Sequence, residues 1–401
     1  MIKQSNFKIK RHKRVYQGAA LRRIGAFKMV GGILLLCVLF FVGYSVAEPV
    51  MSFLSGDMRI RLGQQSNASS QLPQSSSQPS SVPSQQTAGT VAFSEIKALF
   101  MPNTVLADDT RFEAFVTQAK TVGANTIVIS VKDASGVIYY NSALSQPHEI
   151  GAVMEDTPDI TKRIETLSEQ GIQTIAHLHA FKDPLAARKI KGAAVRYSKD
   201  VTTNWLDNYP TEGGKPWINP ESTEGMSYVT SLIAELAQSG AAYVMVDSLH
   251  YPTGVGLNLA YFGPKSNDSR TSVLNGCITQ IENAIKDSGC KLIVTYEAGA
   301  YLDKSELIYG GDPAEVSASV IAPLVLPSGF ESGITIGKTR IADPATQAYE
   351  VTKAFLEYLL ADVATGTKVL PVVSTDSGQL SALGELDVTP YILYSTDGKY
   401  E

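Results

Sequence analysis

The 401-residue sequence predicts an α/β fold, a (β/α)8 TIM-like barrel carried behind an N-terminal transmembrane helix and a disordered linker. Three observations lead to this prediction. A basic segment precedes a long apolar run, a stretch rich in Ser, Gln and Pro follows, and a unit of helix, glycine and strand then recurs. The chain therefore divides into a cytoplasmic basic segment (1–28), a transmembrane anchor (29–47), a linker (48–92) and a barrel (93–401).

The basic segment contains nine Lys or Arg residues and no acid, whereas the whole chain has a net charge of −5. The part beyond the segment is therefore acidic. A domain that binds nucleic acid carries its basic residues on the folded part, so we expect no nucleic-acid partner.

The apolar run from Met29 to Ala47 is interrupted only by glycines, Tyr44 and Ser45. As a helix it would rise roughly 28 Å, close to the thickness of the hydrocarbon layer of a membrane. Since the basic side stays in the cytoplasm, the barrel is expected outside the cell membrane. The alternative is a cleaved signal peptide with small residues before Glu48, but the long basic segment and long apolar run favour an anchor.

The linker shows no apolar periodicity over residues 64–90, where Ser, Gln and Pro dominate. Such a composition buries too little surface to offset the conformational entropy of the chain. We therefore expect a flexible spacer between the membrane and the barrel.

Four amphipathic helices are predicted in the first part of the barrel, and each ends at a glycine. Asp109, Asp159 and Ser222 precede the first three helices and have side chains that cap helix N-termini. Glycine just past a helix adopts the left-handed C-terminal conformation at little cost. The four glycines are Gly123, Gly171, Gly240 and Gly289.

Eight apolar, β-rich runs are the predicted strands. They are residues 96–100, 126–131, 174–178, 243–246, 292–295, 320–325, 368–373 and 390–394. Near-continuous apolar strands between helices indicate a parallel sheet covered on both faces. Eight such strands over about 300 residues fit a closed barrel. The alternative, an open doubly wound sheet, would need a Gly-rich phosphate turn after an early strand, and the sequence has none.

Three cysteines are present, one of them, Cys37, inside the apolar run. Cys277 falls within a predicted helix and Cys290 just before a predicted strand, too far apart for a disulfide. We expect two buried thiols. No spacing typical of a metal site is present, so neither a metal nor a cofactor is predicted.

The active site of such a barrel lies at the carboxyl ends of the strands. Asp247 directly follows the fourth predicted strand and Glu297 the fifth. Paired carboxylates perform glycoside hydrolysis, so we predict Asp247 as nucleophile or base and Glu297 as proton donor. The predicted substrate-binding residues around them are Asp133, Lys132, His179, Lys182, Asp183, Trp217, His250, Tyr251, Tyr296 and Asp376.

Several of these residues have a simpler interpretation. Asp376 and Asp183, which precedes Pro184, would also serve as ordinary caps of a turn or helix. His177 and His179 alternate on one strand and so share one face. A pair of ligands to a metal is conceivable, but the sequence shows no third ligand, which favours a supporting role in the core.

At these strand ends the chain resembles the putative glycosyl hydrolase domain family over residues 95–375. The stretches that carry the resemblance are 131–136, 180–184, 217–220, 246–252 and 322–328. The resemblance implies a TIM-barrel fold in a bacterial protein that is secreted or anchored to the membrane. The placement of Asp247, Glu297 and Asp376 after the fourth, fifth and seventh strands is also similar to the layout of α-amylase-like hydrolases.

The chain departs from the family pattern at four positions. Ser248 and His250 stand where the family has an aromatic and a basic residue, and Leu324 and Leu326 replace a methionine and a tyrosine. The sequence therefore predicts a glycoside hydrolase acting on a cell-envelope or extracellular polysaccharide, with two alternatives. One is a non-catalytic carbohydrate-binding barrel, which needs only an aromatic rim, and the other is an envelope scaffold without a glycan site.

Overall fold

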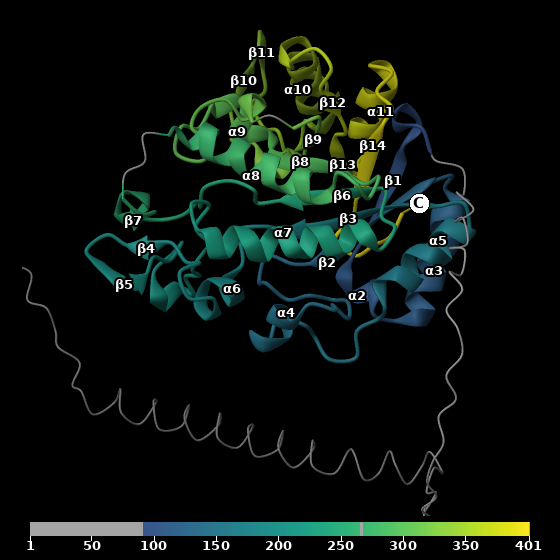
Figure 1. Cartoon of the computed structure of the whole chain (residues 1–401). Helices are drawn as coiled ribbons and strands as arrows, with labels where there is room; N and C mark the ends of the chain where they lie inside the picture. Colours follow the sequence, from purple (N-terminus) through teal and green to yellow (C-terminus); the bar gives the residue numbers. More distant parts are fainter. Residues whose placement is uncertain (1–90, 265–267, 317, 401) are drawn as a thin grey trace, which may run out of the picture. The chain divides into compact units, whose positions relative to one another are not determined.

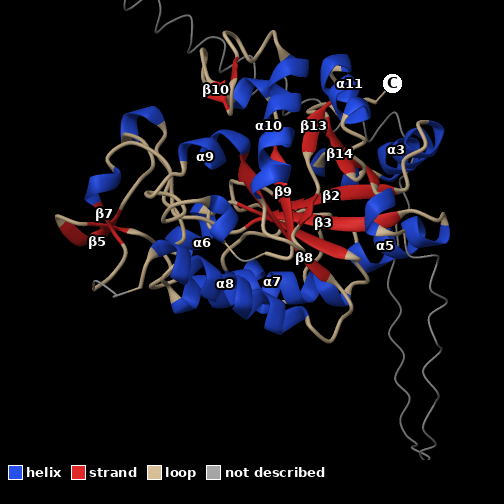
Figure 2. Cartoon of the chain, turned by 90° about the horizontal axis from the view of Figure 1, so that it is seen from above, coloured by secondary structure: helices blue, strands red, loops and turns tan. Residues whose placement is uncertain are grey.

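Eight parallel strands close into a ring in the computed structural model, which describes residues 91–264, 268–316 and 318–400 (Figures 1 and 2). The strands are β1 (Lys97–Met101), β2 (Thr126–Lys132), β3 (Gln173–His179), β6 (Tyr243–Asp247), β8 (Lys291–Glu297), β9 (Val320–Leu324), β13 (Val372–Ser374) and β14 (Tyr391–Tyr394). Each strand pairs in parallel with the next, and β14 pairs with β1, so the ring has no free edge. The predicted barrel is confirmed and the open sheet is wrong.

The seventh predicted strand is split in two. Its first part, β12 (Lys368–Val369), pairs with β9 next to Val320, and β13 pairs with β9 at Leu324. Between them lies Pro371, which has no backbone N–H to donate to a neighbouring strand. The interruption therefore falls where a continuous ladder of hydrogen bonds is chemically impossible.

Side chains alternate between the inside and the outside of the barrel, as strand geometry requires. Every strand contributes at least one residue to the packed interior, among them Ala98, Val128, Ile175, Met245, Ile293, Ala322, Val372 and Ile392. Their neighbours, such as Ile127 and Ile129 on β2, pack outward against the helices. The barrel is therefore filled, and a ligand can enter only above this layer.

Helices surround the strands in the view from above (Figure 2). The main ones are α3 (Asp109–Thr121), α5 (Ile160–Glu169), α7 (Thr223–Gln238), α8 (Arg270–Ile285), α10 (Ala348–Asp362) and α11 (Ser377–Glu385). The four predicted helices are the first four of these. The glycines that follow those helices have φ between +74° and +96°, in the left-handed region.

Two of the three predicted N-caps are confirmed. The Asp159 carboxylate accepts hydrogen bonds from two backbone N–H groups of α5, and Ser222 accepts one from α7. The prediction for the first helix was wrong by one residue, because Asp108 is the cap and Asp109 is the first helical residue. Either carboxylate is chemically able to cap, and the extended backbone of Asp108 decides between them.

The barrel also carries shorter helices, 3₁₀ turns and short strands. The helices are α2 (Asn103–Leu106), α4 (Ser145–Glu149), α6 (Pro184–Lys189) and α9 (Ala298–Asp303), with 3₁₀ turns at Phe93–Glu95, Pro210–Glu212, Leu257–Leu259, Pro313–Glu315 and Pro327–Gly329. Strands β4 (Arg196–Tyr197), β5 (Asp200–Asn204) and β7 (Ala260–Tyr261) form a small antiparallel sheet, and β10 (Thr335–Ile336) pairs with β11 (Thr339–Arg340). The three-stranded sheet joins the loops that follow β3 and β6, so it ties together two segments at the carboxyl end of the barrel.

Cys277 and Cys290 are both buried and unpaired, as predicted. Burial raises the pKa of each thiol to about 12, so both are inert at neutral pH. The predicted cytoplasmic segment and transmembrane anchor, and all but the last two residues of the linker, lie outside the described residues. Among the helices that the structure describes, none has the length and apolar character needed to span a bilayer.

Candidate active site

A cavity of about 490 Å³ opens at the carboxyl ends of the barrel strands. Its lining comes from the ends of several strands and from the loops after β1, β3, β6 and β14. Phe100, Met245 and Val372 lie at its base, where it meets the packed interior of the barrel. The position is the one at which (β/α)8 enzymes place their active sites, and the size suits a small ligand or part of a polymer.

The structure brings seven of the twelve predicted site residues to this cavity. They are Asp247, Glu297, His179, Lys182, Trp217, His250 and Tyr296. The other five, which are Lys132, Asp133, Asp183, Tyr251 and Asp376, are not part of its lining. The lining and the non-lining residues both lie at or after strand ends in the sequence. The direction in which each side chain points therefore decides whether it lines the cavity.

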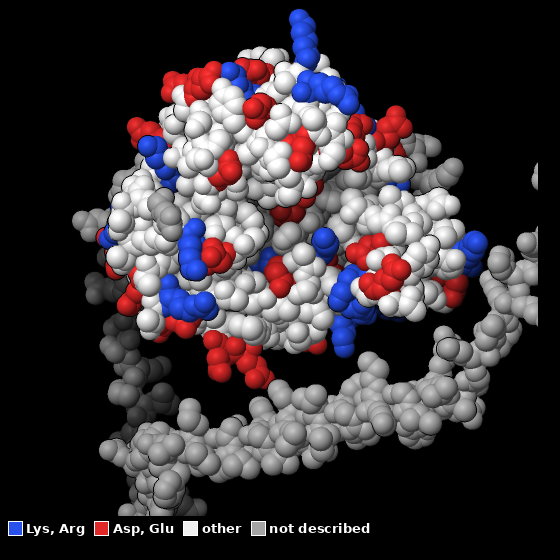
Figure 3. All heavy atoms as spheres, turned by 180° about the vertical axis from the view of Figure 1, so that it is seen from behind, with Lys and Arg blue, Asp and Glu red and all other residues white. Residues whose placement is uncertain are grey.

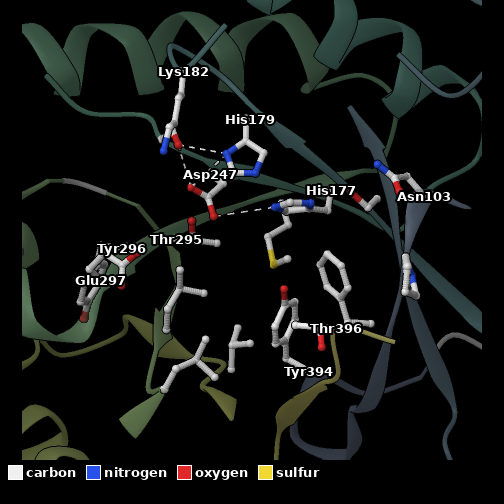
Figure 4. A pocket seen from close by; sticks show the side chains of 18 of the residues that line it. Asn103, His177, His179, Lys182, Asp247, Thr295, Tyr296, Glu297, Tyr394 and Thr396 are labelled. Carbon is white, nitrogen blue, oxygen red and sulfur yellow. Dashed lines mark hydrogen bonds and ion pairs between the residues drawn. The ribbon is translucent and has the colours of Figure 1, made fainter. Parts of the chain in front are cut away.

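Asp247 ends β6 and lies beside His179 of β3, its register partner across the two strands (Figure 4). Its carboxylate oxygens are 3.4 Å from His179 Nδ1 and 3.8 Å from His177 Nε2, and one accepts a hydrogen bond from Ser248 Oγ at 2.9 Å. Burial alone would raise the pKa of Asp247. The charge of His179 and the polar contacts with both imidazoles outweigh burial and hold the pKa well below its usual range. The lowered pKa therefore favours the ionised form of Asp247.

Glu297 ends β8, the strand next to β6, and is exposed at the mouth of the cavity. Partial desolvation raises its pKa first, and the negative charge of Asp247 raises it further, while Lys182 lowers it. Two carboxylates on neighbouring strands thus have pKa values displaced in opposite directions. Pairs of carboxyl groups displaced in this way are typical of sites that carry out acid–base chemistry.

Lys132 and Asp183 form a buried ion pair, with 2.9 Å between Lys132 Nζ and the Asp183 carboxylate. Both side chains are almost completely inaccessible, which keeps them from touching a substrate. Lys132 also donates a hydrogen bond to the His179 carbonyl at 2.7 Å, and Asp183 caps α6 through Ala186 N. The pair therefore holds the end of β3, which carries His179, in place beneath the cavity.

Asp133, Asp376 and Tyr251 have local structural partners. Asp133 accepts four hydrogen bonds from the turn that follows it, one of them from Tyr139 Oη at 2.8 Å. Asp376 caps α11, and the Tyr251 hydroxyl donates to Glu221 at 2.8 Å. These roles match the simpler interpretation of strand-end acids, because such a carboxylate can satisfy the next loop instead of the cavity.

The aromatic residues near the site form a buried wall rather than an exposed rim. Trp217 is only 1% exposed, and its Nε1 donates to Asp207 at 3.0 Å. Its ring faces the Lys182 ammonium at 5.6 Å and the His250 ring at 5.7 Å. Tyr296 is 4% exposed and stacks on Tyr301. The aromatic wall therefore shapes the cavity and supports Lys182 more than it offers a flat surface for a sugar ring.

Several lining residues were not among the predicted site residues, and three of them, His177, Ser248 and Tyr394, carry polar groups close to Asp247 or at a strand end. His177 lies two positions before His179, so alternation along the strand already placed both rings on one face. Tyr394 ends the eighth strand, and the rule that selected Asp247 would also have selected it. Ser248 has φ of +55°, an uncommon value for serine, and this turn brings its hydroxyl to Asp247.

The third neighbour of the two histidines, which sequence analysis did not find, is Asp247. One ligand atom each from His177, His179 and Asp247 lie within 4.8 Å of one another. The carboxylate comes from β6 and the imidazoles from β3, so no spacing along the chain reveals the cluster.

The family described as "Putative glycosyl hydrolase domain" matches residues 98–375, more than half of the chain. The chain belongs to this family. The sequence stretches that carry the resemblance to this glycosyl hydrolase family lie close together in the fold. They contribute Lys132, Asp183, Trp217 and Asp247 in or directly beneath the cavity. A comparison with curated proteins found no match.

Several solved structures are similar to this chain, and one of them has a TM-score above 0.5. The glycoside hydrolase domain of PgaB (BpsB) from Bordetella bronchiseptica has a TM-score of 0.53 at 11% identity, covering 76% of this chain and 94% of that one. A hypothetical protein from Ruminiclostridium thermocellum has a TM-score of 0.43 at 20% identity, covering 48% and 96%. The glycoside hydrolase domain of PelA from Pseudomonas aeruginosa has a TM-score of 0.39 at 13% identity, covering 76% and 96%. At these identities the likeness concerns the fold alone.

Proposed function

We propose that the barrel is a glycoside hydrolase that cleaves a cell-envelope or extracellular polysaccharide, with Asp247 and Glu297 as its catalytic pair. The observation that carries this proposal is the position of two carboxylates from adjacent strands in one cavity at the carboxyl end of the barrel. Their pKa values, displaced in opposite directions, support the assignment. Membership of a glycosyl hydrolase family and the shared fold with the PgaB domain support the same reaction class.

The chemistry assigns one role to each carboxyl group. Glu297, whose raised pKa favours the protonated form, donates a proton to the oxygen of the departing sugar. Asp247, kept ionised, either attacks the anomeric carbon or removes a proton from an attacking water. Neighbouring strands lie about 4.8 Å apart, and Glu297 is two residues beyond the position on β8 that lies level with Asp247. This offset is compatible with the ~5 to ~9.5 Å that separate the carboxyl groups of retaining and inverting enzymes.

The cavity also contains cationic and hydrogen-bonding groups that suit a sugar. Lys182, from the loop after β3, and His179 both line the cavity near Asp247 (Figure 4). His250, from the loop after β6, also lines it. On the face seen in Figure 3, acidic and basic residues are interspersed and no single basic surface forms. That distribution is unlike a nucleic-acid interface and agrees with a polysaccharide as partner.

The pH profile tests the pair directly. Because Asp247 stays ionised below its ordinary value of 3.8, activity should persist on the acid side. Activity should be lost as pH rises through the pKa of Glu297, which lies above 4.5, because Glu297 is then deprotonated and has no proton to donate. The measurement is kcat/KM for sugar release against pH.

A single substitution should move one limb of this profile. Lys182 lowers the pKa of Glu297, so Lys182→Met should shift the alkaline limb to higher pH while the acid limb stays in place. An alkaline limb that stays fixed or moves to lower pH in this variant would contradict the assignment of Glu297 as proton donor.

The rival function is a carbohydrate-binding barrel without catalysis, favoured by Ser248 and His250 at positions where the family has other residues. A glycan panel separates the two functions if the purified protein is scored both for binding and for release of reducing ends. Release supports the hydrolase. Binding of a glycan that is never cleaved supports the rival.

We also propose that residues 29–47 anchor the chain in the cell membrane with the barrel outside. Nine basic residues precede this run and no acid accompanies them, which favours a cytoplasmic N-terminus. Protease added to intact cells should then cut within 48–92 and release the barrel. A barrel that is cut only after the cells are opened would contradict this orientation.

A further inference from the structure

Two imidazoles and one carboxylate converge at the base of the cavity. Asp247 lies between the rings of His177 and His179, and both rings turn a nitrogen toward it (Figure 4). Among the residues that the structure describes, both ion pairs of Asp247 are with these imidazoles. Two imidazole nitrogens and one carboxylate oxygen therefore share one small volume.

The separations suit a metal ion. Ligand atoms that lie about 2.1 Å from a tetrahedral zinc ion are about 3.4 Å from one another. The distance from His179 Nδ1 to Asp247 is 3.4 Å, and that from His177 Nε2 is 3.8 Å. All three donor atoms fall within 4.8 Å of one another, so small side-chain rotations would complete the triangle.

Backbone geometry holds the three side chains in this arrangement. His177 and His179 occupy alternate positions of β3 and so face the same side, and Asp247 is the register partner of His179 on β6. Lys132 fixes the carbonyl of His179 with a 2.7 Å hydrogen bond. A site built on adjacent barrel strands loses little entropy when an ion binds, because its ligands are already in place.

Burial leaves one side of the triangle open. The His177 side chain is 6% exposed, whereas those of His179 and Asp247 are 22% and 19% exposed toward the cavity. Two ammonium groups, those of Lys132 and Lys182, would repel a cation here, but each has a carboxyl group nearby. Lys132 has its own anionic partner in Asp183 at 2.9 Å, and the charge of Lys182 acts on Glu297.

We propose that His177 Nε2, His179 Nδ1 and the Asp247 carboxylate bind one divalent transition-metal ion of the zinc type, with a free coordination position facing the cavity. Imidazole nitrogens favour zinc and its neighbours, whereas magnesium and calcium prefer ligand sets made of oxygen. Three protein ligands with one open position are the pattern of zinc sites that accept water or substrate. Ser248 Oγ, 3.0 Å from His179 Nδ1, gives way to the ion and keeps its 2.9 Å contact with Asp247.

Metal binding does not depend on the proposed hydrolase activity, but it has a consequence for it. The ion would occupy the carboxylate that serves as nucleophile or base. Zinc should therefore inhibit sugar release, and a chelator should restore it. This consequence, unlike the binding itself, rests on the proposed function.

The test is calorimetric titration of the chelator-treated full-length protein with zinc chloride, with the metal content measured independently by elemental analysis. We expect one zinc ion per chain and no binding of magnesium under the same conditions. His179→Gln and Asp247→Asn, both at partly exposed positions, should weaken zinc binding about 100-fold or more. His177→Ala should do the same if it folds.

The matched control is His250→Gln. His250 lines the same cavity, but its Nδ1 contacts the Tyr251 carbonyl at 2.7 Å and it lies outside the cluster, so zinc affinity should be unchanged. Cobalt substitution gives a second readout, because the absorption of a tetrahedral cobalt site should disappear in His179→Gln. Wild-type protein that binds no zinc, or zinc binding equally tight in the His179 and Asp247 variants, would overturn the proposal whatever the result for sugar release.

Discussion

Asp247→Asn and Glu297→Gln should each lower the rate of sugar release by about 10²- to 10⁴-fold, the usual contribution of a general acid or base. Asp247→Asn removes the carboxylate that attacks the anomeric carbon or deprotonates the attacking water. Glu297→Gln removes the carboxyl proton that is donated to the departing sugar. Both changes keep the size of the side chain, and both positions line the cavity without supporting the barrel core. The measurement is initial-rate release of reducing ends at the wild-type pH optimum.

Glycan binding should largely survive both changes, since the amides still form hydrogen bonds. Asp376→Asn is the matched control, because this acid also follows a barrel strand but caps α11, where asparagine serves as well. Its activity should equal that of the wild type. Full activity in both cavity variants would show that the pair is misassigned, as would an equal loss in the Asp376 variant.

Asp183→Asn should destabilise the protein by about 3 to 5 kcal/mol, the cost of leaving one partner of a buried ion pair without the other. The Lys132 ammonium would keep its charge in a site where neither side chain reaches solvent. Asparagine still caps α6, so the loss measures the charge and not the cap. Urea unfolding at equilibrium gives the change in the free energy of unfolding.

A double-mutant cycle isolates the pair. Lys132→Met combined with Asp183→Asn removes both charges, so the double variant should lose much less stability than the two single changes added together. The exposed pair of Lys162 and Asp159, 3.9 Å apart, provides the control, and Lys162→Met should cost less than about 1 kcal/mol. If Asp183→Asn costs no more than this surface change, the buried pair does not hold the end of β3 as we describe.

Local patterns in the sequence determined the barrel. Near-continuous apolar runs, capping residues such as Ser222 and glycines such as Gly240 are short-range signals, and each acts on the few residues around it. Seven of the eight predicted strands therefore appear in the structure with ends shifted by at most two residues, and the remaining one is split at Pro371. Where two neighbours were equally suited, as with Asp108 and Asp109, only the backbone of the folded chain made the choice.

Some residues of the candidate site could also be predicted from short-range signals in the sequence. The carboxyl ends of all barrel strands lie at one mouth, so Asp247 and Glu297 could be identified from the sequence. The same rule selected Asp133, which instead satisfies its own turn, and Lys132, which is buried beside Asp183. A strand-end side chain can turn toward the cavity or toward its loop, and this choice depends on the path of segments far away in the chain.

What the sequence alone determined is therefore the barrel and the set of polar groups available at its mouth. Tertiary structure decided which of those groups meet. Asp247 reaches His177 and His179 because β6 pairs with β3 in one particular register, and it shares a cavity with Glu297 because β8 follows β6 around the ring. Strand register depends on packing throughout the closed barrel, and no segment of the sequence contains that information by itself.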